Sequence, residues 1–316
     1  MAASLGPCLR APLGAGVDTA HMALPRSRAH SRRPATDTPV PKSRAPERAR
    51  RDDGEYVRAL ERGLEVLKAF NGRTPSMSMT QVAERAGLTR AVARRYLFTL
   101  EALGYVVHQD GQFRLTPRVL DFGFTYLAAS GLSDVARPFM EQIVATLRES
   151  CSVGVLDGGD VVYVARVTAD RIMTTNLVVG SRLPAHATSM GKVLLAFLSP
   201  ERLAAYFAAT TLRPLTDRTI ADQETLRTVL DGVRRRGWAT NDEESEKGVR
   251  TVSVPLRDRS GDVIAAINLS GHASRVSMRE LKRDHLPVLL DAAREISRAL
   301  GAQVVDPAGA DADDAD

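Results

Sequence analysis

Residues 77–106 (MSMTQVAERAGLTRAVARRYLFTLEALGYV) restrict the fold more than any other part of the chain, because two helix starts and one helix stop fall within them. Ser78 and Gln81 form an S-x-x-Q capping box, in which each side chain bonds the backbone of the other residue and starts a helix. Gly87 is the type of residue that ends such a helix, and Thr89 is a good N-cap for a second one. The pattern predicts two helices joined by a tight turn.

The segments on either side extend this motif. Residues 56–70 place apolar side chains at helical spacing, which predicts an amphipathic helix before the pair. Residues 105–116 (YVVHQDGQFRLT) have the composition of two short strands, and Asp110-Gly111 between them is a strong hairpin signal. Helices, a tight turn and a hairpin in this order are typical of a winged helix-turn-helix, which we predict over residues 56–116.

The second helix of the pair has two different faces. At about 100° per residue its apolar residues fall on one arc, and Arg90, Ala91, Arg94 and Arg95 fall on the opposite arc. Arginines near a helix start can contact guanine edges or phosphates in the major groove of DNA, and a small residue permits close approach. The alternative is a basic face that contacts only solvent. With the helix cap and the wing included, the residues predicted to bind double-stranded DNA are Thr89, Arg90, Ala91, Arg94, Arg95, Gln112 and Arg114.

Charge and composition agree with this interpretation and exclude other classes. The net charge is +5, and most of the excess Lys and Arg lies in the first 116 residues, which favours nucleic acid as the partner of this end. No apolar run is long enough for a membrane span. The only cysteines, Cys8 and Cys151, sit in unlike contexts and the histidines are scattered, so we expect no metal, no cofactor and a reducing, cytoplasmic location.

The rest of the chain divides into a tail at each end, a linker and a larger domain. Residues 1–55 are predicted to be a disordered basic tail, and residues 305–316, with five aspartates, a disordered acidic tail. Residues 117–131 predict an apolar linker helix. Its Leu120, Phe124 and Leu127 would be buried by pairing with a second subunit, and an ordinary core helix is the alternative.

Residues 132–304 predict an α+β domain. A first helix is followed by a strand, a Gly-rich turn and a strand, and then by residues 172–179 (IMTTNLVV) as a third strand. Three helices follow, then three more strands and a final helix that begins at a capping box. Hairpins separated by a helical block are typical of an antiparallel sheet with helices packed on it.

Ser189 and Lys192 form an S-x-x-K motif at a predicted helix start, the spacing used by some serine acyl-transfer enzymes. Those enzymes also need S-D-N and K-T-G elements, which are absent downstream of Ser189, so a serine hydrolase remains only the alternative function. A helix start that binds an anion is the favoured explanation, because free backbone N–H groups and the positive end of the helix dipole attract a carboxylate. Gly191 would let the backbone approach closely.

Small polar residues on the later strands fit the same interpretation. Asn241, Thr251, Asn268 and Ser270 supply neutral amide and hydroxyl groups, which suit a small organic acid better than a dense cluster of charges would. The alternative is that these side chains simply face solvent.

Residues 56–304 together resemble the IclR family of bacterial transcriptional regulators. The segments that carry the resemblance are YVRALERGLEVLKAF, AGLTRAVARRYLFTLEALGYV, FRLTPRVLDFG, LPAHATSMGKVLLA, GWATNDEESEKGVRTVSVPLRD and AAINLSGHASR. Three segments are most similar to sequences of the subgroup that governs protocatechuate, 4-hydroxybenzoate and β-ketoadipate catabolism: TRAVARRYLFTLEALGYV, DGGDVVYVARV and RIMT.

The resemblance implies a winged helix-turn-helix joined by a linker helix to a GAF-like effector domain. It also implies a homodimer or a dimer of dimers on a promoter, with an organic acid such as protocatechuate, 4-hydroxybenzoate or β-ketoadipate altering operator binding. Carried over by position, the effector-binding residues are Ser189, Met190, Gly191, Asn241, Thr251, Asn268 and Ser270. Met190 stands where some members have a smaller residue, and Asn241 stands where some have an acid. A ligand sensor whose basic helix binds another protein is the remaining alternative.

Overall fold

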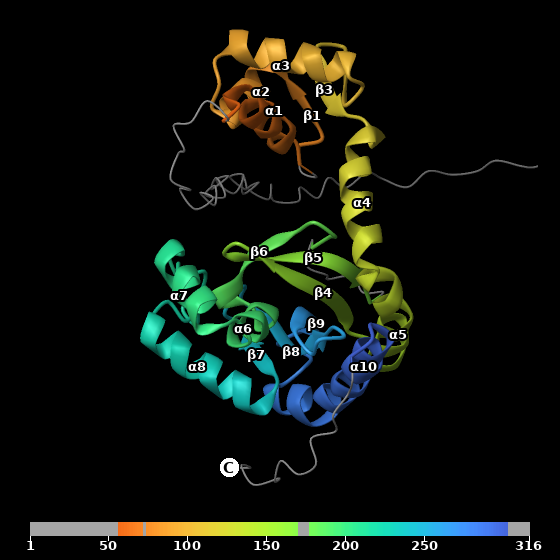
Figure 1. The fold of residues 1–316 in the computed structure, drawn as a ribbon, viewed down its shortest axis with the longest axis vertical. Coiled ribbons are helices and arrows are strands. Elements are labelled where there is room, and N and C mark those ends of the chain that lie inside the picture. Colours follow the sequence, from red (N-terminus) through yellow and green to blue (C-terminus); the bar gives the residue numbers. More distant parts are fainter. Residues whose placement is uncertain (1–55, 72–73, 170–176, 303–316) are drawn as a thin grey trace, which may run out of the picture. The chain divides into compact units, whose positions relative to one another are not determined.

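The computed structural model describes residues 56–71, 74–169 and 177–302 (Figure 1). The two predicted tails, residues 1–55 and 305–316, lie outside these ranges. Two antiparallel sheets organise the described chain: one has three strands in the order β1-β3-β2, and the other has six in the order β6-β5-β4-β9-β8-β7. Helices accompany both sheets, so the predicted α+β class with a winged helix-turn-helix followed by an antiparallel-sheet domain is confirmed.

The winged helix-turn-helix forms where the local signals predict it. Its elements are α1 (Arg58–Ala69), β1 (Ser76–Ser78), α2 (Met79–Ala86), α3 (Arg90–Ala102), β2 (Val106–Gln109) and β3 (Gln112–Leu115). The Ser78–Gln81 capping box is present with both of its hydrogen bonds, and Gly87 ends α2 in the left-handed conformation with φ at 66°. Asp110 and Gly111 both have positive φ, as a tight hairpin turn between β2 and β3 requires.

Strand β1 was not predicted. Ser76–Ser78 pairs with β3, with Met77 opposite Phe113, so the segment that starts α2 is also a strand of the wing sheet. Met77 and Phe113 are both almost fully buried in the core of this part of the chain, together with Val82 and Leu97. The core therefore contains residues from the helices and from the wing.

The predicted linker is helical. A short 3-10 turn, η1 (Pro117–Val119), leads into α4 (Leu120–Ser130), which is followed by α5 (Leu132–Leu147). Leu120 is exposed, which leaves it available for contact with a second subunit. Leu127 instead packs against the main core of the six-stranded sheet. The side chain of Phe124 lies outside what the structure describes. Leu127 thus has part of the burial that a core helix would give it, and pairing of this helix with a second subunit stays a prediction.

The six-stranded sheet lies between two helical layers (Figure 1). Helix α5 and the final helix α10 (Leu286–Ala299) pack on one face, and α6 (Ser189–Ala196) and α8 (Gln223–Arg236) pack on the other. The strands are β4 (Ser150–Asp157), β5 (Asp160–Val167), β6 (Arg182–Pro184), β7 (Ala239–Asp242), β8 (Val249–Arg257) and β9 (Val263–His272). Helix α7 (Pro200–Ala209) joins the α6–α8 layer, where Tyr206 and Phe207 are buried.

Two details differ from the predictions for this domain. The third strand expected at residues 172–179 is wrong for its described part, since residues 177–179 approach a turn in which the Ser181 hydroxyl accepts a hydrogen bond from the Val178 amide. The strand that forms is β6, after that turn. The final helix begins at its capping box as α9 (Met278–Glu280), but a π-helical turn, η3 (Leu281–His285), separates it from α10. Pro287 follows that turn and has no N–H for a regular helical bond.

No described helix is both long enough and apolar enough to cross a membrane.

Candidate functional site

The predicted DNA-contacting face of α3 is exposed. Ala93, Leu97 and Leu100 point into the core, whereas Arg90, Ala91, Arg94 and Arg95 lie on the surface. Thr89 caps the helix, because its hydroxyl accepts a hydrogen bond from the Val92 amide at 3.4 Å. In the structure, Thr89 therefore fixes the start of α3.

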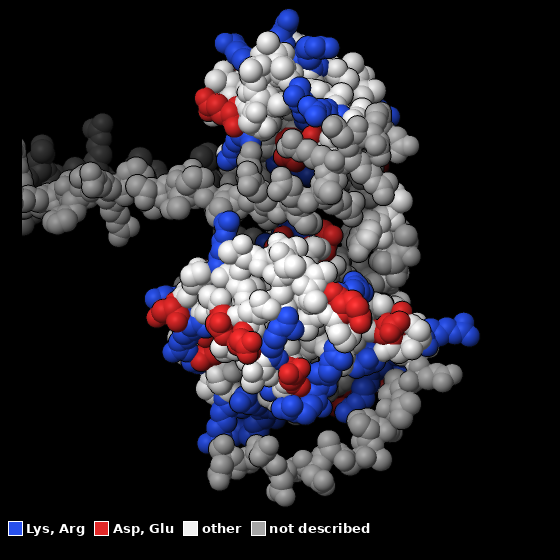
Figure 2. All heavy atoms as spheres, turned by 60° about the vertical axis from the view of Figure 1, so that its left-hand side comes forward, with Lys and Arg blue, Asp and Glu red and all other residues white. Residues whose placement is uncertain are grey.

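The arginines of α3 are available to an external anion. The Arg94 guanidinium lies over the Phe98 ring at 5.0 Å from the ring centre, which aligns the side chain along the helix surface. Among the described residues, no carboxylate pairs with Arg90, Arg94 or Arg95. Figure 2 shows Lys and Arg side chains on the described surface of this part of the chain, at the top of the view.

The wing residues lie on β3. Arg114 is exposed, and its Nε donates to the Ser76 hydroxyl of β1 at 3.4 Å. Gln112 is partly exposed at the start of the same strand. The two side chains are thus presented from a sheet rather than from a free loop.

The start of α6 is the centre of the second predicted site. Thr188 is the N-cap, and its hydroxyl accepts a hydrogen bond from the Gly191 amide at 3.0 Å. All eight residues of α6 are buried. A Cβ atom on Gly191 would lie 2.0 Å from the Ala185 carbonyl oxygen, so the close backbone approach predicted for this glycine is made by the segment just before the helix.

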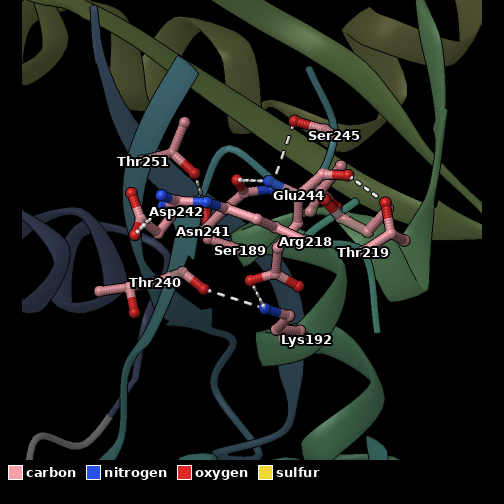
Figure 3. Close-up of polar contacts among 12 residues, drawn as sticks. Ser189, Lys192, Arg218, Thr219, Thr240, Asn241, Asp242, Glu244, Ser245 and Thr251 are labelled. Carbon is pink, nitrogen blue, oxygen red and sulfur yellow. Dashed lines mark hydrogen bonds and ion pairs between the residues drawn. The ribbon is translucent and has the colours of Figure 1, made fainter. Parts of the chain in front are cut away.

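Ser189 contacts the sheet directly. Its hydroxyl shares hydrogen bonds with the hydroxyls of Thr251, at 2.5 Å, and Ser253, at 2.6 Å (Figure 3 shows Ser189 and Thr251). Ser253 was missed by the sequence analysis, although it lies two residues after Thr251 on β8 and therefore on the same face. The helix start is held against β8 by these hydroxyls.

Lys192 has a different partner from Ser189. Its ammonium group pairs with the Glu244 carboxylate and donates to the Thr240 carbonyl at 3.1 Å (Figure 3). Burial lowers the pKa of Lys192 and raises the pKa of Glu244, and the attraction between the two charges opposes both shifts. The lysine serves as one half of a buried ion pair rather than as a base beside the serine hydroxyl.

Asn241 is held by the backbone around it. Its Nδ2 donates to the Ala187 carbonyl at 2.5 Å and to the Ser245 hydroxyl at 3.3 Å, and its Oδ1 accepts from the Glu244 amide at 3.0 Å. These bonds tie β7 to the segment before α6 and to the loop that carries Glu244. The structure thus gives Asn241 a positioning role.

The remaining predicted residues share one face of the sheet. Thr251 lies opposite Ser270, and Ser253 lies opposite Asn268, on the adjacent strands β8 and β9. Directly paired residues of an antiparallel sheet project to the same side, and the bonds of Ser189 show that this side faces α6. Ser189, Thr251, Asn268 and Ser270 are therefore brought to one surface, as predicted.

Met190 fills the space beside this surface. It is fully buried, and a Cβ atom added to Gly154 of β4 would lie 3.2 Å from both its Sδ and its Cε. The thioether thus packs over the point where β4 has no side chain.

Comparisons with known proteins agree with the fold. The chain matches the family model "Bacterial transcriptional regulator IclR C-terminal" over residues 124–298 and "IclR helix-turn-helix domain" over residues 59–110. It is 39% identical to the Pca regulon regulatory protein of Pseudomonas putida over 249 residues, which cover 78% of this chain and 86% of that protein.

Two further relatives are informative. The p-hydroxybenzoate hydroxylase transcriptional activator of Acinetobacter baylyi is 38% identical, covering 77% of this chain and 91% of that protein. The crystal structure of an IclR homolog complexed with 4-hydroxybenzoate, from Microbacterium hydrocarbonoxydans, is similar with a TM-score of 0.68 and 27% identity, covering 77% of this chain and 98% of that one.

The winged helix-turn-helix, the antiparallel-sheet domain and these matches together identify the chain as a ligand-responsive, DNA-binding transcriptional regulator. The chain belongs to the IclR family. Because its relatives are named as transcriptional regulators, the chain is not an enzyme, and the serine hydrolase alternative is set aside.

Proposed function

We propose that this protein controls the transcription of genes for aromatic acid catabolism by binding operator DNA through α3 and the wing. The observation that supports DNA binding is the exposed face of α3, next to the wing sheet, which presents Arg90, Arg94 and Arg95. Residues 56–116 form the DNA-binding domain, residues 117–131 the linker and residues 132–304 the effector domain, and the protein acts in the cytoplasm.

The proposed effector is a small aromatic acid or a related ring-cleavage product. Two of the relatives are named as the Pca regulon regulatory protein and the p-hydroxybenzoate hydroxylase transcriptional activator, and one homolog is solved with 4-hydroxybenzoate. The polar surface under α6 offers hydroxyl and amide groups that suit a hydroxylated acid. Protocatechuate, 4-hydroxybenzoate and β-ketoadipate are the first compounds to test.

The proposed regulator acts as a homodimer or as a dimer of dimers. Apolar side chains are exposed on α1 and α4, among them Leu60, Leu64, Leu120 and Phe122. A second copy of the chain would cover such surfaces.

A fluorescence anisotropy titration tests the proposal as a whole. The DNA is the protein's own upstream region, at two salt concentrations, with and without each acid. We expect salt-sensitive, sequence-specific binding that one acid changes. Specific binding that no acid changes would remove the proposed effectors and keep the regulator. Binding that ignores both sequence and salt would contradict the assignment of α3.

Replacing Arg94 or Arg95 by alanine is expected to weaken operator binding by about 1–3 kcal/mol if the side chain contacts a base. If it contacts a phosphate, the loss is similar for all sequences and the salt dependence falls by about one charge. Anisotropy titrations at several salt concentrations separate the two cases. Arg235→Ala, which removes an exposed arginine of α8, is the matched control and should leave operator affinity unchanged. Unchanged affinity in both α3 variants would refute the recognition-helix assignment.

Replacing Asn268 by alanine is expected to abolish the response to the effector while operator affinity without ligand stays unchanged. Asn268 is buried on the α6 side of β9, remote in sequence from α3. The measurement is operator anisotropy with and without the acid, together with the melting temperature of the variant. A variant that melts at the normal temperature and still responds would show that Asn268 does not bind the effector.

A further inference from the structure

One end of the six-stranded sheet carries a cluster of cations from segments that are far apart in the chain. They come from the last turn of α8, from the end of β8 with the turn that follows it, and from η3. Figure 2 shows Lys and Arg side chains gathered on the lower part of the described sheet domain. We call this set the basic patch: Arg234, Arg235, Arg236, Arg257, Arg259 and Lys282.

Contacts around Phe197, at the end of α6, join the arginines of β8 to those of α8. The Arg257 guanidinium lies over the Phe197 ring, 4.8 Å from its centre. Arg234 donates at 2.6 Å to each of the carbonyls of Ala196 and Leu198, on either side of that ring. The two guanidinium groups are therefore neighbours.

Trp238, which directly precedes β7, joins the other cations in the same way. The Arg236 guanidinium lies 4.5 Å from the centre of the Trp238 ring, and the Lys282 ammonium lies 6.0 Å from it. Since Arg234, Arg235 and Arg236 are consecutive, the groups around the two rings form one continuous surface.

Nearby carboxylates do not neutralise this patch. Among the described residues, none pairs with any of its six cations. Asp258 and Asp262 of the β8–β9 turn accept hydrogen bonds from the Ser260 hydroxyl instead. Partial desolvation lowers the pKa of Arg236, and the like charge of Arg235 lowers it further, as expected where positive charges are crowded.

The dipole of α8 explains only part of the cluster. Positive side chains are stabilised near the carboxyl end of a helix, which accounts for the three arginines in the last turn of α8. Arg257, Arg259 and Lys282 belong to other elements, so a partner with negative charge is the simpler explanation for the whole patch.

The described chain ends beside the patch. The Ser297 hydroxyl of α10 accepts a hydrogen bond from the Arg257 amide at 3.0 Å. A Cβ atom on Gly301 would lie 3.5 Å from the Cβ of Arg259. Residues 303–316 therefore begin next to two arginines of the patch.

The charge and length of residues 303–316 suit this surface. They include five aspartates and no Lys or Arg. Fully extended, they would reach roughly 45–50 Å, which exceeds the distance across one side of a domain of this size. Each exposed ion pair is weak by itself, but attachment to the same chain gives the segment an effective concentration on the order of millimolar.

We propose that residues 303–316 bind back onto the basic patch of the same chain, with their aspartates paired to its arginines and the last of them near Trp238. This interaction is independent of the effector and of the operator. It would cover a cationic surface that otherwise attracts other polyanions, including DNA of any sequence.

The test uses Trp238, the single tryptophan, as a probe inside the patch. A nitroxide, which quenches tryptophan fluorescence only at short range, is attached to the full chain at Ala315→Cys. Cys8→Ser removes the other reactive thiol, since Cys151 is fully buried. At low salt we expect the nitroxide to quench Trp238, with the same quenching at every protein concentration. High salt should restore the fluorescence because it screens exposed ion pairs.

Two kinds of variant identify the contacts. Replacing all five aspartates of residues 303–316 by asparagine should abolish the quenching without any change in the described fold. Arg235→Glu combined with Arg259→Glu should also abolish it. The matched control is Lys247→Glu, a charge reversal of an exposed residue at the opposite end of β7 from Trp238, which should leave the quenching unchanged. Circular dichroism checks that each variant is folded.

Three results would overturn the proposal. The first is the absence of quenching at low salt. The second is quenching that persists in the asparagine variant or in the folded Arg235→Glu, Arg259→Glu variant. The third is quenching that increases with protein concentration, which would assign the patch to the same segment of a second copy of the chain.

Discussion

Replacing Gly191 by alanine is expected to destabilise the effector domain by about 3 kcal/mol or more, the upper end for an overpacked core. The new Cβ atom would lie 2.0 Å from the Ala185 carbonyl oxygen, and the two nearest other atoms are also backbone. No side-chain movement relieves that overlap, so the helix start must separate from the segment before it. Urea unfolding followed by the fluorescence of Trp238, the single tryptophan, measures the change in this domain.

The matched control is Gly232→Ala in α8. There the nearest atom to a new Cβ is the end of the Arg236 side chain, at 3.3 Å, and that side chain can move. Because alanine favours a helix over glycine by about 1 kcal/mol, this variant should be as stable as wild type or slightly more so. Equal stability of the two alanine variants would show that the contact between Gly191 and Ala185 is not close.

Replacing Lys192 by methionine is expected to lower the free energy of unfolding by about 3–5 kcal/mol, because the Glu244 carboxylate would remain buried without its partner. The double variant Lys192→Met with Glu244→Leu removes both charges and should recover most of the loss. The same urea titration compares the three proteins.

An exposed ion pair supplies the control for this prediction. Lys247 and Asp217 are 3.1 Å apart and both are largely exposed, so Lys247→Met should change stability by less than about 1 kcal/mol. If Lys192→Met is no more harmful than Lys247→Met, the buried pair does not stabilise the junction between α6 and the loop after β7.

Local chemistry made much of the fold predictable from sequence. The capping box at Ser78, the left-handed Gly87 and the Asp110-Gly111 turn each act within a few residues, and all three form as predicted. Strand β1 was missed because three residues are too few for an alternating pattern and its pairing partner, β3, lies far along the chain. The strand expected at residues 172–179 was wrong in its described part because an apolar run does not distinguish a strand from a segment that leads into a turn.

The candidate effector site was predictable only in part. Ser189, Thr251 and Asn268 were identified because their segments resemble those of the family, and the structure brings them to one face. Ser152 joins that face through strand register alone, which pairs β4 with β9. A single sequence does not show register, so this residue had no signal of its own. The role of Glu244 in a buried ion pair was not predicted, because Glu244 lies in a run of charged residues that would ordinarily face solvent.

The pairing of β1 with β3 has a consequence for how an effector can act. Because β1 runs directly into α2 and pairs with the strand that carries Arg114, the wing and the helix-turn-helix share one sheet and one core. Effector binding therefore has no hinge about which it could move the wing away from α3. Each DNA-binding domain is expected to move as a rigid body. In a dimer, what remains adjustable is the distance and angle between two such bodies, so the response is expected to depend on the spacing of the operator half-sites rather than on the sequence within either one.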